Sequence, residues 1–105
     1  FNPVHMDGDW ARKNTHYPDR IAHGVMTTAL MSQPLVQFCE RYKIRTALLT
    51  SSSRYTRAVI AGDTVTTTVR LVEKMDAKKR IRFEVETKNQ NDEVVMIGEL
   101  LEQCI

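Results

Sequence analysis

The sequence predicts an α+β fold in which one long, central, apolar helix is wrapped by an antiparallel β-sheet with a single polar face. Two observations carry this prediction. Apolar residues follow a helical pattern from Val25 to Tyr42, and the later half of the chain alternates between apolar and polar residues with the period of a strand. A sheet that curls around the helix buries the apolar side of both elements.

Composition and net charge predict one domain and argue against several classes of protein. The 105 residues, 42% hydrophobic and 27% charged, predict a single domain spanning residues 1–105. The net charge of +2 is too small to indicate nucleic-acid binding, and no apolar run is long enough to predict a membrane span. Two cysteines match neither a disulfide framework nor a zinc site, so we expect no metal, no cofactor and a reducing, cytoplasmic environment.

The first half of the chain is expected to be helical. A short helix candidate covers residues 8–13, and a Pro-containing connector at 15–19 separates it from the apolar helix. Apolar residues cover nearly all angles of the first half of residues 25–42 but only one side of the second, so this helix should start buried and end near solvent. Pro34 lacks the amide that would bond to the Leu30 carbonyl, which predicts a kink or a break.

Four strands are expected in the second half. Residues 80–88 are the clearest case, because apolar or threonine side chains alternate with charged ones. Val and Thr recur with the same period over residues 64–72, and an apolar run covers 94–101 after the turn at 89–92. Three such strands in succession predict an antiparallel meander. Residues 47–59 are the fourth candidate.

Three segments resemble the signature of a known enzyme family. Asn2-Pro3-Val4-His5 and Ala22-His23-Gly24 are similar to the Asn-Pro-x-His and Ala/Val-His-Gly motifs of the MaoC-like, (R)-specific enoyl-CoA hydratases. Residues 57–64 resemble the Arg-Pro-Val-x-x-Gly-Asp-Thr turn of the same family. The resemblance covers nearly the whole chain and implies a hot-dog fold, with the family's N-terminal strand missing from this sequence.

The resemblance also implies an activity. Members of this family are hydro-lyases of fatty acid metabolism, which add water reversibly to trans-2-enoyl thioesters and form (R)-3-hydroxyacyl thioesters. The expected partner is an acyl-CoA or acyl-carrier-protein thioester. A homodimer is expected too, because pairing of sheets edge to edge covers an exposed strand. The family signature includes an Asp that would immediately precede Phe1, and we expect the full-length molecule to carry it.

Hydration requires a base for the attacking water, an acid that protonates C2, and donors for the enolate oxygen. His5 is the candidate base, because an imidazole suits proton transfer at physiological pH. Gly24 is the candidate oxyanion donor. Its amide starts the apolar helix, and its missing side chain lets a thioester carbonyl approach the backbone.

Three further residues are candidates for holding the substrate or the site. Asn2 precedes a proline and is held extended, so its amide can orient the loop that carries the histidine, although an ordinary turn looks the same. His23 either hydrogen-bonds the backbone of the loop that carries His5 and holds Gly24 in place, or is a buried histidine bonded to a backbone carbonyl, and we favour the structural role. Ser32 either faces the site, as in the hydratases, or caps a second helical segment.

Two other functions stay open. A hot-dog thioesterase shares the helix-end donor but uses a carboxylate on or near the helix to activate water. No carboxylate lies between Gly24 and Cys39, which favours hydration, although Glu40 keeps hydrolysis possible. A non-catalytic partner subunit of a dehydratase would keep the fold and the dimer surface but lack the Asp of the signature.

Overall fold

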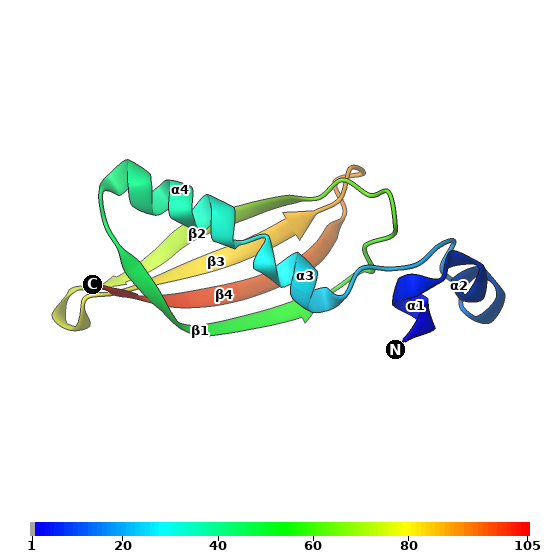
Figure 1. The fold of residues 1–105 in the computed structure, drawn as a ribbon. Helices are drawn as coiled ribbons and strands as arrows, with labels where there is room; N and C mark the ends of the chain where they lie inside the picture. Colours follow the sequence, from blue (N-terminus) through cyan, green and yellow to red (C-terminus); the bar gives the residue numbers. More distant parts are fainter. Residues whose placement is uncertain (1) are drawn as a thin grey trace.

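The computed structural model describes residues 2–105 and shows helices on one face of a four-stranded sheet (Figure 1). The elements in chain order are α1 (Pro3–Met6), α2 (Gly8–Asn14), α3 (Gly24–Ala29), α4 (Ser32–Tyr42), β1 (Thr46–Tyr55), β2 (Thr66–Met75), η1 (Asp76–Lys78), β3 (Arg80–Lys88) and β4 (Val94–Cys104). Helix α4 lies across the sheet, whereas α1 and α2 lie beyond its end. The predicted α+β class is confirmed.

The sheet has the strand order β1-β4-β3-β2 and is antiparallel throughout. Strands β2, β3 and β4 form the predicted meander, and β1 lies at the free edge next to β4. Strand β1 ends at Tyr55, four residues earlier than expected. The ladder stops there because the Thr56 and Arg57 amides both donate to the Val95 carbonyl, at 3.0 and 3.4 Å. The following residues pair instead with the segment before α3, through a bridge between Ile21 and Ile60.

The core lies between α4 and the two central strands. The alternation over residues 80–88 is realised as predicted, because Ile81, Phe83, Val85 and Thr87 are all buried. Phe83 meets the Phe38 ring of α4 edge to face, with 5.0 Å between the ring centroids. Apolar burial of this kind is the main source of stability for such a fold. Strand β4 adds Met96 and Leu100 to the same cluster, and α4 adds Leu35.

The helix expected over residues 25–42 is broken one turn before Pro34. Helix α3 ends at Ala29 and α4 starts at Ser32, so the break falls at Leu30 and Met31. Pro34 is thereby the third residue of α4, where a backbone amide has no acceptor within the helix. The structure thus confirms the predicted break and places proline where its missing amide costs least.

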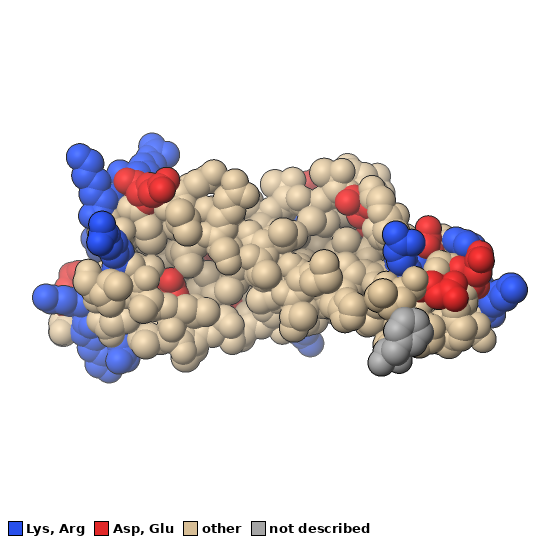
Figure 2. Space-filling view, viewed as in Figure 1, with Lys and Arg blue, Asp and Glu red and all other residues tan. Residues whose placement is uncertain are grey.

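The start of this helical segment is exposed, which corrects the expectation that it is buried. Val25 and Met26 are 73% and 60% exposed, and Thr27 is the buried residue of α3. The reason is that α3 lies over the end of β1 and not over the core (Figure 1). In space-filling view, charged side chains gather toward the two ends of the molecule and are sparse over this middle region (Figure 2).

A buried carboxylate, Glu102, lies in β4 opposite the core residue Ile81. Its residue exposure is 2%, and the Thr46 hydroxyl donates to Oε1 at 3.0 Å. Within the described residues, Oε2 has no hydrogen-bond partner. Burial raises the pKa of Glu102, and the hydrogen bond from Thr46 partly offsets this.

None of the helices formed by residues 2–105 combines the length and the apolar character that a membrane crossing requires.

Candidate active site

His5 lies on a short helical turn and not in the loop expected for it. The Asn2 side chain caps α1 by accepting a hydrogen bond from the Val4 amide at 3.2 Å, which gives Asn2 a local role. His5 Nδ1 lies 2.9 Å from the Ile21 carbonyl oxygen. Because a carbonyl oxygen can only accept, Nδ1 carries the hydrogen, and Nε2 of the neutral ring keeps a lone pair. His5 is therefore oriented to accept a proton at Nε2.

Backbone hydrogen bonds fix the segment that holds His5. The Ile21 amide donates to the Val4 carbonyl at 3.0 Å, and the Ala22 amide donates to the Val59 carbonyl at 2.8 Å. Residues 20–22 are thereby held between α1 and the chain that follows β1. The Ile21 carbonyl that accepts from the His5 imidazole therefore belongs to a segment that backbone hydrogen bonds hold in place.

The turn at residues 57–64 supports this arrangement from the other side. Asp63 accepts from the Ile60 amide and from the Gln90 side chain, both at 2.9 Å. Gly62 adopts a φ of +93°, a conformation that favours glycine. These contacts hold the Val59 carbonyl in place to receive the amide that precedes His23-Gly24.

His23 is exposed and stacks on His5, which corrects the prediction that it is buried and bonded to the backbone. The ring centroids are 3.9 Å apart and the planes are inclined by 26°. His23 is the N-cap residue of α3, and its side chain makes no capping hydrogen bond.

Gly24 is the first residue of α3, and the ring of Tyr55 covers its Cα. A Cβ atom at Gly24 would lie 2.8 Å from Tyr55 Cζ and 2.9 Å from Cε2. Glycine is therefore required by the packing of Tyr55. The expectation that the missing side chain leaves open space for a carbonyl is corrected, because the tyrosine fills that direction.

His5 and Gly24 nevertheless line one cavity of about 350 Å³. We call it the His5 cavity. Its other lining residues are Tyr17, Ile21, Ala22, Thr27, Tyr55, Thr56, Arg57, Ala58, Val59 and Val95. An adjacent hollow of about 380 Å³ shares His5 and adds His23, Met26 and Arg20. The structure thus brings together His5, His23 and Gly24.

Two predicted residues lie outside this group. Asn2 and Ser32 line neither the His5 cavity nor the adjacent hollow as the described residues form them. Ser32 is the exposed first residue of α4, and Met31 occupies the cap position. Ser32 therefore neither faces the His5 cavity nor caps the helix. The catalytic Asp expected before Phe1 lies outside the described residues.

Tyr55 was missed by sequence reasoning. It ends an ordinary strand, and nothing in the local pattern shows that it reaches the start of a helix that lies far back in the chain. Its hydroxyl lies 2.6 Å from Thr28 Oγ1 of α3. Its place two residues before the turn at residues 57–64 is the sequence feature that associates it with the site.

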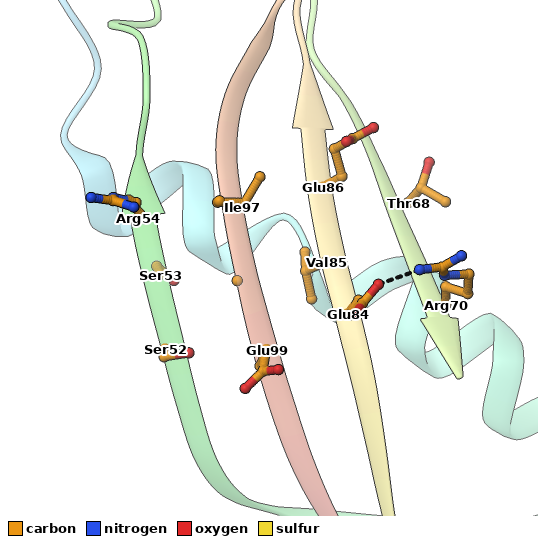
Figure 3. Close-up of a pocket in the computed structure, with 11 residues that line it drawn as sticks. Ser52, Ser53, Arg54, Thr68, Arg70, Glu84, Val85, Glu86, Ile97 and Glu99 are labelled. Atoms are coloured by element: carbon orange, nitrogen blue, oxygen red, sulfur yellow. Dashed lines mark hydrogen bonds and ion pairs between the residues drawn. The ribbon is translucent and has the colours of Figure 1, made fainter. Parts of the chain in front are cut away.

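A larger hollow, about 750 Å³, lies on the face of the sheet that points away from the helices (Figure 3). Its charged residues come from all four strands, and Arg70 and Glu84 are paired to each other. Residues of the His5 cavity are not among its lining. We therefore place the candidate site in the smaller cavity, where an oriented imidazole is available. Within residues 2–105, no three His, Cys, Asp or Glu side chains form a metal-binding group.

Comparison with known proteins adds the following findings. A family model described as "MaoC like domain" matches residues 1–94. The (R)-hydratase from A. caviae involved in PHA biosynthesis is 25% identical, with a TM-score of 0.87, and the match covers 98% of this chain and 76% of that one. R-hydratase PhaJ1 from Pseudomonas aeruginosa is 31% identical, with a TM-score of 0.82 and coverage of 98% and 64%.

A hypothetical thioesterase from Streptococcus pneumoniae, solved with coenzyme A, is 20% identical with a TM-score of 0.73, and the match covers 81% of this chain and 65% of that one. At this identity the likeness concerns the fold alone. No curated protein matches the chain. The helix-on-sheet arrangement and these neighbours together confirm the hot-dog fold.

Proposed function

Because this chain belongs to the MaoC-like domain family, we propose that it is a hydro-lyase that adds water reversibly to trans-2-enoyl thioesters and forms (R)-3-hydroxyacyl thioesters. One observation carries the proposal. His5 donates through Nδ1 to the Ile21 carbonyl, which leaves Nε2 as a base in a cavity that Gly24 also lines. The similarity to two (R)-hydratases supports the same reaction.

The proposed reaction assigns a role to each group. His5 Nε2 takes a proton from water while the water oxygen bonds to C3 of the enoyl group. Electrons move onto the thioester oxygen, and the Gly24 amide donates to the enolate that forms. C2 then takes a proton from a second acid. Among the described residues that line the His5 cavity there is no carboxylate. We assign this role to the Asp expected before Phe1.

Two arginines favour a substrate that carries phosphate groups. Arg57 lines the His5 cavity and pairs with Glu93 at 3.0 Å, and Arg20 lines the adjacent hollow. Coenzyme A and the phosphopantetheine arm of a carrier protein both carry phosphate, for which arginine is a good partner. The proposed substrate is therefore an acyl-CoA or an acyl-carrier thioester.

Hydrolysis of the thioester is the second candidate, because thioesterase neighbours share the fold. Glu40, the carboxylate that kept this function open, is exposed near the C-terminal end of α4. Helix α4 leads away from α3 and from α1, the helix that contains His5 (Figure 1). The absence of a carboxylate in the described cavity also favours a third candidate, a non-catalytic partner subunit. Hydration by the isolated full-length chain separates these functions.

The test replaces His5 by alanine in the full-length protein. We expect hydration of trans-2-butenoyl-CoA, followed by loss of the enoyl absorbance, to fall by about 10²–10⁴-fold, the usual contribution of a general base. The stability loss should stay near 1 kcal/mol, since one hydrogen bond is removed. His16→Ala is the matched control, because His16 is an exposed histidine that does not line the cavity.

Wild-type turnover in His5→Ala would contradict the assignment of the base. A thiol reagent added to the same reactions measures released coenzyme A. Thiol release without hydration by the wild-type protein would favour the thioesterase, and neither activity would favour the partner subunit.

A further inference from the structure

A chain of three hydroxyl groups connects α3 to β1 at the wall of the His5 cavity. Thr28 Oγ1 lies 2.6 Å from the Tyr55 hydroxyl and 3.1 Å from Ser53 Oγ. Thr28 has one hydroxyl hydrogen, which it can donate to Ser53 while Tyr55 donates to Thr28. The phenol hydrogen is then engaged, so Tyr55 acts here through its position and not as a proton donor.

The Tyr55 ring is held at both ends. Its face covers Gly24, where even a methyl group would be too close, and its hydroxyl bonds to Thr28 one helical turn further on. Met96, opposite Tyr55 in the ladder, lies 3.4 Å from Thr28 Oγ1 through its sulfur. A ring held in this way is a fixed wall of the cavity, because turning it would break the hydroxyl contact.

The helix-facing side of β1 is uncovered beyond this wall. By register, Ser53 lies opposite Gly98 and Ser51 opposite the core residue Leu100, so both belong to the face that the helices cover elsewhere. Every residue of β1 from Ala47 to Tyr55 is nonetheless exposed. Tyr55 therefore stands between the His5 cavity and the exposed helix-facing side of β1.

On the basis of the proposed function, we propose that Tyr55 determines the acyl-chain specificity of this site by closing the His5 cavity toward the exposed helix-facing side of β1. A cavity of about 350 Å³ is at the small end of ligand sites. It must hold the thioester carbonyl, C2, C3 and the attacking water beside His5. With Tyr55 in place, the favoured substrates are short enoyl thioesters, and longer chains have to pass Tyr55 toward the exposed side of β1.

The experiment compares four-carbon with eight-carbon substrates in the full-length protein. Tyr55→Ala should raise the ratio of kcat/KM for trans-2-octenoyl-CoA over trans-2-butenoyl-CoA by about tenfold or more, within the range expected for reshaping an apolar pocket. Tyr55→Phe and Thr28→Val keep the bulk of the wall but remove the hydroxyl contact, so they should raise the ratio by a smaller factor. Tyr42→Ala, an exposed tyrosine of α4, is the matched control.

A second measurement separates this inference from the proposed reaction. Calorimetric binding of butanoyl-CoA and octanoyl-CoA reports chain-length preference without turnover, and the affinity ratio should shift in the same direction. If wild type binds both ligands but hydrates neither enoyl-CoA, the hydratase proposal fails. The ratio of the two binding affinities still tests whether Tyr55 sets the chain-length preference. Ratios within twofold of wild type in all three variants, each shown to be folded by circular dichroism, would overturn the role of Tyr55. The role of Tyr55 would also be overturned if neither butanoyl-CoA nor octanoyl-CoA binds to the wild type or to any of the variants.

Discussion

His5 owes its proposed chemistry to a single hydrogen bond. The Ile21 carbonyl selects the tautomer in which Nε2 is the free base, and the stacked His23 ring restricts rotation of the imidazole. Neither contact changes the identity of the reacting group. Both decide whether its lone pair points in a constant direction, and orientation is a large part of what a catalytic base contributes.

Glu102 provides a prediction about pH at the same scale. Its pKa is raised by burial, so the protonated carboxyl is favoured more in the folded than in the unfolded protein. The stability associated with this proton is present below the unfolded pKa, about 4.3, and is lost as the pH rises through the raised value. Glu102→Gln removes this titration. We expect the variant to be more stable than wild type at pH 7–8, with the difference shrinking toward pH 4.

Urea midpoints measured from pH 4 to pH 8 test this expectation. Glu99→Gln is the control, because Glu99 lies on the same strand but is exposed, with a long 3.9 Å ion pair to Arg82. A difference between Glu102→Gln and wild type that does not change with pH would show that burial does not control this carboxyl.

The contact between β1 and β4 depends on a glycine. Gly98 pairs with Ser53, and a Cβ atom at Gly98 would overlap the Ser52 carbonyl oxygen. The requirement is for space, since the backbone of the neighbouring strand approaches closely here. The same pair of strands carries Ser53 and Tyr55, so this close approach helps to place the hydroxyl chain against α3.

Gly98→Ala should therefore destabilise the fold by about 1–3 kcal/mol, the usual cost of adding a methyl group where the backbone must move. Thermal or urea unfolding measures this effect. Ile97→Ala, one residue earlier on the exposed face, should cost less. Equal midpoints for Gly98→Ala and wild type would mean that the two strands separate without penalty.

At the scale of the whole molecule, helix α3 and strand β1 each present an exposed surface. Helix α3 exposes Val25 and Met26, and β1 forms a sheet edge of ten residues. Few charges lie over the middle of this face (Figure 2). An exposed strand edge beside an apolar patch is typical of an association surface. A homodimer that pairs these surfaces is the proposed state.

Sedimentation of the full-length protein tests this proposal. We expect a dimer for wild type and a shift toward monomer for Met26→Glu, because a buried carboxylate without a partner is costly. Ile105→Glu is the control, since Ile105 is also exposed but lies at the other end of the molecule. A wild-type monomer at micromolar concentration, or an unshifted Met26→Glu dimer, would contradict the proposed interface.

The elements that repeat a local pattern were predictable from the sequence. Strand β3 has the predicted bounds, because alternation over residues 80–88 reports directly on a strand with one buried face. The helical break near Pro34 was predictable from the chemistry of the proline ring. The motif of His5 and Gly24 indicated the family, which the match over residues 1–94 confirms. Each of these inferences uses neighbours in the chain and the geometry they impose.

Other features depend on contacts between segments far apart in the sequence. The ring of Tyr55 over Gly24, the stacking of His23 on His5, and the exposure of Val25 have no local signal. A sequence pattern determines which side of an element is apolar, but the packing of the elements decides which side chain fills a given space. For this protein, the chain itself determined the fold and indicated the candidate residues of the site, and tertiary packing decided the shape of the cavity around them.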